Sequence, residues 1–145
     1  CYSPIEDTLY WSFNEEVSRH AKQDVPSRRF AMFRYLNPAG LSQLEKMGYE
    51  KYSAGGAFLG IIDVALGRSS ADLCGHIQVH DALIPYSFAK NYGVIVTDEK
   101  GETLSKMDLK INSKGFERIP KMCFFANKEV RDELAPILQQ SKYLE

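Results

Sequence analysis

The chain has 145 residues, of which 44% are hydrophobic and 26% are charged, and its formal net charge is -1. This is the composition of an ordinary globular protein, and the length is enough for one sizeable core. The charge balance shows no basic field of the kind that nucleic-acid-binding proteins carry. The longest apolar run is well short of the ~20 residues that a membrane-spanning helix needs. We therefore expect a protein that acts neither on nucleic acid nor within a membrane.

The three cysteines and the first residues indicate the cellular compartment of the protein and whether the chain is part of a longer one. Cys1, Cys74 and Cys123 are odd in number and scattered, which does not suggest a disulfide framework. No basic segment followed by an apolar stretch opens the chain as a secretory signal would. The opening CYSPIEDTLYW lacks an initiator Met. We expect a cytoplasmic protein and interpret the chain as a piece of a longer one.

The first 36 residues combine an apolar segment, a polar segment and a strand. Residues 1–13 place apolar and aromatic side chains around a turn-like Pro4-Ile5-Glu6-Asp7, which predicts a β-hairpin. Residues 14–28 are polar with one proline, so they are expected to form a linker or a loose surface helix. Residues 29–36, RFAMFRYL, predict a strand that ends at Asn37-Pro38, and this pair suits a helix start.

Two helices and a short strand follow. Apolar residues recur at a spacing of three within residues 39–48, which indicates a short helix. Residues 49–53 predict a brief strand. Residues 55–68, GGAFLGIIDVALGR, are apolar on all sides except at Asp63, so this helix should be buried within a larger body. Glycines that can end the two helices are Gly48 and Gly67.

The next segment alternates, and then changes its period. Residues 73–80, LCGHIQVH, alternate apolar and polar side chains and predict a strand with one face of each kind. Residues 81–93 predict a helix with Asp81 at its start, Pro85 near its first turn and Gly93 at its end.

The last elements complete an α/β pattern. Residues 94–102 predict a strand and a turn, residues 121–127 another strand, and residues 128–140 an amphipathic helix. Strands that alternate with helices imply a layered α/β domain. We assign residues 1–13 to a remnant hairpin of an N-terminal domain, residues 14–28 to a linker, and residues 29–145 to an α/β domain with a mixed sheet and helices on both faces.

The glycine pair Gly55-Gly56 lies where a strand turns into a buried helix. The first N–H groups of a helix have no backbone partner, and the helix dipole adds partial positive charge there. Glycine lets a ligand approach that backbone closely, so this is a candidate phosphate site. The alternative is that the glycines only allow the helix to pack tightly against a strand.

Asp81 has two interpretations. As an N-cap it would only satisfy amide groups at the start of its helix. As a carboxylate at the carboxyl end of a strand, where α/β sheets place ligands, it could hold a divalent metal such as Mg²⁺. A zinc site of Cys74, His76 and His80 is a weaker hypothesis, because Cys74 and His80 would be ~20 Å apart along an extended strand.

Three stretches of the chain carry a resemblance to a known family. They are GGAFLGIIDVALGR at 55–68, HDALIPYSFAKNYGVIVTDEKGE at 80–102 and MCFFANKEVRDEL at 122–134. They resemble the inositol monophosphatase family, which also includes fructose-1,6-bisphosphatases and phosphatases of nucleotide 3′-phosphates. The family's C-terminal half has a Gly-Ser/Thr/Ala-Ala helix start, a V-A-x-G-R/G helix end, a W-D-x-A-A-G motif and a glycine-led strand and turn.

The resemblance implies the C-terminal part of a Mg²⁺-dependent phosphomonoesterase. Family members hold two or three Mg²⁺ ions beside a phosphate ester. By resemblance, Asp81 is one metal ligand, Gly55, Gly56 and Ala57 contact the substrate, and Cys74 occupies the place of an acidic residue that contacts substrate hydroxyls. The implied substrate is a small phosphorylated metabolite: an inositol phosphate, a sugar phosphate or a nucleotide 3′-phosphate.

Several departures from the family pattern keep a second function open. His80 replaces the family's Trp, and Leu83-Ile84-Pro85 replaces its small residues. The D-P-I/L-D-G-T motif does not occur in the sequence. This motif and the Glu-Glu pair of the family's N-terminal half bind most of the metal, and we expect both to lie outside this chain. No catalytic residue is assigned within the chain. We expect it to be inactive alone, to form a homo-oligomer or to require a missing N-terminal half. The alternative is a non-catalytic binding module.

Overall fold

The computed structural model describes residues 2–3, 8–9, 12–13, 16–17, 26–32, 36–74, 79–98, 100–104 and 122–140. Side chains are described within these ranges except in the four short N-terminal strands, at Met32 and at residues 79–83.

The domain is built on a mixed five-stranded sheet with the order β6-β5-β7-β9-β8. The strands are β5 (Arg29–Met32), β6 (Glu50–Tyr52), β7 (Ala71–Cys74), β8 (Ile95–Asp98) and β9 (Met122–Phe125). β5 pairs in parallel with both β6 and β7, whereas β9 pairs antiparallel with β7 and β8. Within this sheet, β9 therefore runs opposite to the other four strands.

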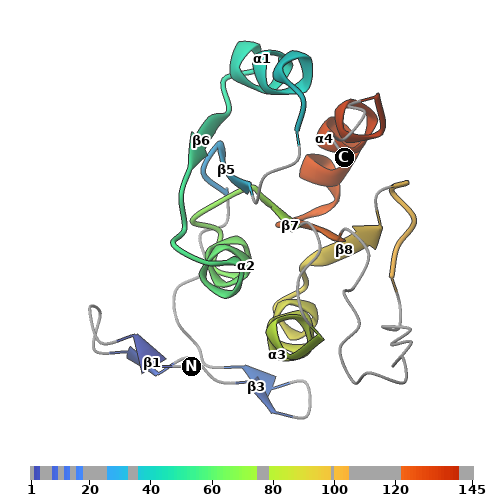
Figure 1. The fold of residues 1–145 in the computed structure, drawn as a ribbon. Coiled ribbons are helices and arrows are strands. Elements are labelled where there is room, and N and C mark those ends of the chain that lie inside the picture. Colours follow the sequence, from blue (N-terminus) through green and yellow to red (C-terminus); the bar gives the residue numbers. More distant parts are fainter. Residues whose placement is uncertain are drawn as a thin grey trace.

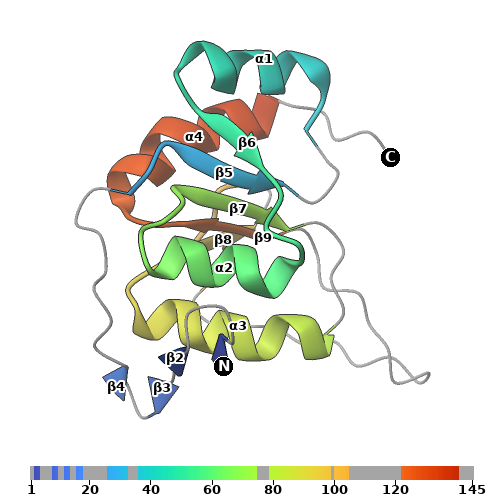
Figure 2. The ribbon, with the colours of Figure 1, turned by 90° about the vertical axis from the view of Figure 1, so that its left-hand side faces the viewer.

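Helices cover both faces of the sheet. They are α1 (Pro38–Lys46), α2 (Ala57–Ala65), α3 (Val79–Asn91) and α4 (Lys128–Gln140). Figures 1 and 2 show α1 and α4 on one face and α2 and α3 on the other. The predicted α/β architecture, a layered mixed sheet with helices on both faces, is confirmed.

The core consists of one apolar cluster on each side of the sheet. Phe30 and Phe125 point to the α1/α4 side, and Phe124 points to the α2/α3 side. Every residue of β7 and of β9 is buried, because strands that are covered on both faces have no solvent side. α4 buries the apolar positions of its amphipathic pattern, namely Val130, Leu134, Ile137 and Leu138.

The predicted start of α1 and the predicted C-terminal ends of α1, α2 and α3 are confirmed. Asn37 caps α1, since its Oδ1 accepts a hydrogen bond of 2.8 Å from the Gly40 N–H, and Pro38 is the first helical residue. Gly48, Gly67 and Gly93 follow α1, α2 and α3 with φ values of 82°, 74° and 76°. This left-handed conformation is costly for other residues, so glycine ends these helices.

The N-terminal residues form two short antiparallel pairs. β1 (Tyr2–Ser3) pairs with β2 (Thr8–Leu9), as the hairpin prediction required. β3 (Ser12–Phe13) pairs with β4 (Glu16–Val17), so the expectation of a linker or surface helix is wrong at Glu16–Val17. Cross-strand backbone pairing, which a polar composition does not reveal, defines this strand. Residues 18–25 lie outside the described residues.

The strand predicted over residues 73–80 is wrong at its C-terminal end. β7 stops at Cys74, residues 75–78 lie outside the described residues, and Val79 already begins α3. Asp81 is consequently the third residue of α3 rather than its start. Pro85 lies inside the helix, where it is buried, and not in its first turn.

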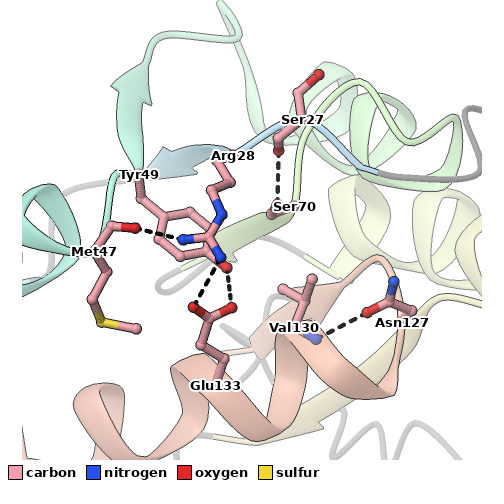
Figure 3. Close-up of polar contacts among 8 residues, drawn as sticks. All are labelled: Ser27, Arg28, Met47, Tyr49, Ser70, Asn127, Val130 and Glu133. Atoms are coloured by element: carbon pink, nitrogen blue, oxygen red, sulfur yellow. Dashed lines mark hydrogen bonds and ion pairs between the residues drawn. The ribbon is translucent and has the colours of Figure 1, made fainter.

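A polar cluster joins the residues just before β5 and β6 to α4, at the edge where the parallel strands begin (Figure 3). The Tyr49 hydroxyl donates a hydrogen bond of 2.7 Å to Glu133 Oε2. Arg28 Nη2 lies 3.4 Å from Glu133 Oε1, and the guanidinium lies over the Tyr49 ring. Burial, and then the hydrogen bond and charge of Glu133, raise the pKa of Tyr49 to about 12. The hydroxyl therefore stays protonated as a donor.

We expect Tyr49→Phe to lower the free energy of unfolding by about 1–2 kcal/mol, because it removes a hydrogen bond to a carboxylate and keeps the ring. Glu45→Gln, at an exposed position of α1, is the control and should change stability by less than about 0.5 kcal/mol. Urea unfolding of both variants measures the difference. Tyr49→Phe and Glu133→Ala should also be non-additive, and strict additivity would contradict a direct contact.

Candidate active site

The backbones of the sequence-predicted site residues lie toward one edge of the sheet. β5, β6 and β7 are parallel, α2 follows β6, and α3 follows β7. Both helices run back along the sheet and contact each other, so their N-termini lie at the edge where these strands end (Figure 2). We call this the carboxyl edge. Residues that it collects are Gly55, Gly56, Ala57, Cys74 and Asp81.

The start of α2 presents amide groups without a cap. The first helical hydrogen bond runs from the Gly60 N–H to the Gly56 carbonyl at 3.2 Å, so the N–H groups of residues 57–59 have no acceptor within the helix. Gly56 is the N-cap and provides no side chain, and the first turn holds no acidic residue. By contrast, the α4 amide of Val130 donates to Asn127 Oδ1 at 2.9 Å. Among the described residues no side chain caps the positive end of α2, which is the kind of helix end that binds anions.

Tight packing does not explain the glycine pair. A Cβ on Gly56 would meet nothing within 4 Å, and a Cβ on Gly55 would meet only Leu59 Cδ1 at 4.0 Å, as far as the described atoms show. Gly55 has a φ of 79°, so its glycine serves the backbone turn. Gly56 is extended, a conformation that any residue adopts. None of the described atoms therefore fills the space beside Gly56.

Cys74 ends β7 at the carboxyl edge, but its side chain is 2% exposed and packs in the α2/α3 core cluster. Burial, and then the neighbouring Asp72, raise the pKa of its thiol well above the ordinary value. A neutral, buried thiol does not reach a ligand at the surface of this structure. The assignment of Cys74 to substrate binding stays a prediction, and the structure places its backbone rather than its sulfur near the edge.

Asp81 lies in the first turn of α3, and its side chain lies outside the described residues. The N-cap position that the sequence assigned to it is wrong, because Val79 already belongs to the helix. A carboxylate in the first turn still interacts favourably with the helix dipole. The metal-ligand assignment of Asp81 stays a prediction.

The structure offers no metal cluster among the side chains that it describes. No group of three or more His, Cys, Asp and Glu residues could hold an ion there. The strand face proposed for zinc is lost, because His80 belongs to α3 and His76 lies outside the described residues. The described side chains alone therefore do not fit a two-Mg²⁺ or a zinc site.

None of the helices in the described ranges is long and apolar enough to cross a membrane.

A second polar group lies under α2 and was missed from the sequence. Asp72 is 2% exposed at the centre of the sheet. Nearby, the Tyr52 hydroxyl donates to Asp63 Oδ2 at 2.9 Å, and Arg68 Nη1 lies 3.9 Å from Asp63 Oδ1. The sequence predicted Asp63 as the one polar residue of this helix, and the structure gives it Tyr52 and Arg68 as partners. The only signal for Asp72 was a carboxylate within an otherwise apolar strand.

Comparison with solved structures identifies the fold. A staphylococcal inositol monophosphatase (IMPase-I) complexed with products superimposes with a TM-score of 0.75 at 16% identity, over 99% of this chain and 55% of that one. An IMPase/NADP phosphatase complexed with NADP and Ca²⁺ gives 0.77 at 14%, over 99% and 56%. An inositol monophosphatase family protein from Staphylococcus aureus gives 0.73 at 16%, over 99% and 58%.

Comparisons of the sequence with protein families and with curated proteins identify no relative. No protein-family model matches the chain, and no curated protein matches it. The chain spans a little more than half the length of the structures that it resembles. At 14–16% identity the similarity concerns the fold. The chain thus has the fold of the inositol monophosphatase family over about half of that family's length, as the sequence resemblance predicted.

Proposed function

We propose that this chain is part of a Mg²⁺-dependent phosphomonoesterase that acts on a small phosphorylated metabolite. One observation carries the proposal: the uncapped start of α2 and the first turn of α3, which contains Asp81, lie at the same edge of an inositol monophosphatase-like fold. Ligands of open α/β sheets bind at this edge. Similar proteins are described in complex with Mg²⁺ and phosphate and with D-inositol-1-phosphate.

The residues of the carboxyl edge would have different roles in binding. The amides of Ala57, Phe58 and Leu59 would donate to phosphate oxygens beside the glycine pair, with the helix dipole favouring the negative charge. Asp81 would contribute one carboxylate to a metal. Cys74 would support the edge from the core.

The metal would need further ligands from outside the described residues. A bound Mg²⁺ supplies an acidified water and neutralises charge on the departing oxygen. Because Mg²⁺ requires near-octahedral oxygen coordination, one carboxylate is not enough. We therefore propose that another segment or another chain completes the site, either a missing N-terminal half or a second copy.

A second candidate function is a non-catalytic phosphate-binding module. It follows from the same uncapped helix start combined with the absence of a three-ligand cluster among the described side chains. Phosphate binding that is indifferent to Mg²⁺ favours the module. Phosphate binding that strengthens with Mg²⁺ favours the enzyme.

The glycine pair gives a direct test of the proposed phosphate site at the start of α2. Gly56→Ala should cost at most about 1 kcal/mol of stability, because its backbone is extended and the space beside it is open. It should nevertheless weaken binding of inorganic phosphate severalfold, since the methyl group fills that space. Titration followed by amide NMR shifts at residues 57–59 measures the affinity.

Gly93→Ala is the matched control for that experiment. Gly93 has a φ of 76° and open space around it, but it lies at the other end of α3. The variant should lose about 1–2 kcal/mol of stability and keep its phosphate affinity. If Gly56→Ala binds phosphate as tightly as the wild-type protein, the start of α2 is not the phosphate site.

The metal role of Asp81 is tested by Asp81→Asn in a protein that contains the completed site. The carboxamide loses a favourable interaction with the helix dipole worth about 0.3–1 kcal/mol, so melting should change little. Loss of a metal-ligating charge should lower Mg²⁺ affinity and turnover by about a hundredfold or more. Thermal melting and Mg²⁺ titrations of turnover measure both. If Asp81→Asn keeps near wild-type turnover at the same Mg²⁺ requirement, Asp81 is not a metal ligand, and the resemblance to the family is one of fold alone.

The isolated 145-residue chain should hydrolyse a generic phosphate ester poorly or not at all in Mg²⁺. The reason is the ligand count, because a single assigned carboxylate cannot hold two octahedral ions. Release of inorganic phosphate from the purified chain is the measurement, with buffer plus Mg²⁺ as the blank. Robust Mg²⁺-dependent turnover by this chain would refute the incomplete site.

A further inference from the structure

Asp72 is a buried carboxyl group that the proposed site does not use. It faces α2, because the residues beside it in the register, Ala31 on β5 and Phe124 on β9, belong to the same row across the sheet, and Phe124 packs in the α2/α3 cluster. A Cβ on Gly60 of α2 would lie 2.9 Å from Asp72 Cγ, closer still to Asp72 Oδ2, and 3.2 Å from the Ala31 Cβ. The small residues Gly60 and Ala31 therefore leave the space that the carboxyl group fills.

The surroundings of this carboxyl group do not stabilise a negative charge well. Its Oδ2 atom is buried and has no hydrogen-bond partner among the residues that the structure describes. The Cys74 thiol and the Leu73 amide interact with the carboxyl group and favour ionisation, but burial outweighs them. An ionised carboxylate with an unpartnered oxygen in the core is costly, and such groups usually remain protonated.

The other titratable groups near Asp72 come from three elements. Asp63 on α2 has the same sign of charge and acts against ionisation of Asp72. Tyr52 on β6 donates its hydroxyl to Asp63, and Arg68 after α2 pairs with Asp63. Cys74 on β7 is itself held neutral by burial. At the register position of Asp72, β5 and β9 contribute the apolar Ala31 and Phe124.

We propose that Asp72 is a proton-binding switch that makes the packing of α2 against β7 depend on pH. Uncharged, its carboxyl group fits the space beside Gly60. Ionised, it draws water into the layer between α2 and the sheet and loosens the helix. The switch does not depend on phosphatase activity, although α2 is also the helix that begins with the glycine pair.

The direction of the pH effect follows from the two states of the protein. Burial, followed by the charge of Asp63, raises the pKa of Asp72 from 3.8 to about 8 in the folded protein. Between these values the folded protein binds more protons than the unfolded chain, so stability falls as pH rises. The contribution of Asp72 is complete below about pH 4 and is lost by about pH 8.

The experiment is thermal and urea unfolding from pH 5 to pH 9 of the wild-type chain, Asp72→Asn and Asp63→Asn. Asparagine keeps the shape of the neutral carboxyl group and cannot ionise. We expect the wild-type melting temperature to fall between pH 5 and 8, and Asp72→Asn to show a flatter profile. Asp63→Asn, the control, should keep the fall but shift it to lower pH, because the charge that raises the pKa of Asp72 is removed. Equal slopes in wild type and Asp72→Asn would overturn the proposal.

Two further measurements keep the test decisive if Asp72→Asn folds poorly. The wild-type protein at pH 6 should show the infrared band of a protonated buried carboxyl group that disappears toward pH 9; its absence at pH 6 would overturn the proposal. Hydrogen exchange of α2 amides should rise from pH 6 to pH 9 beyond the intrinsic increase, whereas α4 amides should follow the intrinsic increase alone. Equal behaviour of the two helices would also count against the switch.

The fit between Asp72 and Gly60 is tested by a double-mutant cycle. Gly60→Ala should destabilise the wild-type protein, because the new methyl group meets the carboxyl group of Asp72. In the Asp72→Ala background the same substitution should cost markedly less. Equal costs in the two backgrounds would mean that α2 does not rest on the carboxyl group.

Discussion

The structure depends on helices that cover both faces of one mixed sheet. β7 and β9 are buried at every position because α1 and α4 press on one side and α2 and α3 on the other. A ligand therefore has no access to the faces of these central strands. The ends of the strands are the places where backbone amides and polar side chains can meet solvent, and this constraint directs any chemistry in the described part to an edge.

The two edges of the sheet differ in how their polar groups are used. At the edge where the parallel strands begin, Arg28, Tyr49 and Glu133 satisfy one another and lock α4 to the turn after α1. At the carboxyl edge, α2 begins without a side-chain cap. A protein that caps α1 and α4 with asparagine leaves the start of α2 for a different partner, which is the physical basis for proposing an anion there.

The layer beneath α2 combines close packing with an ionisable group. Gly60 and Ala31 allow α2 to approach the sheet, and Asp72 occupies the space between them. Leu or Val at position 72 would satisfy the core equally well in hydrophobic terms, but neither would bind a proton. The same helix thus has a start without a side-chain cap and, near its middle, a close approach to an ionisable side chain.

The sequence by itself determined the element order, the layered α/β class and most helix ends, because asparagine caps, left-handed glycines and the 3.6-residue period of α4 act locally. It also placed Gly55, Gly56 and Asp81 together in a resemblance to a family fold that the structure bears out. It misplaced the end of β7, since alternation over residues 73–80 imitates a strand whose true extent is set by helices on both faces. It overlooked Asp72 because burial and the space beside Gly60 arise from segments that meet only in the folded protein. Tertiary structure alone decided that the carboxyl group of Asp72 is enclosed and that the thiols of Cys74 and Cys123 are buried.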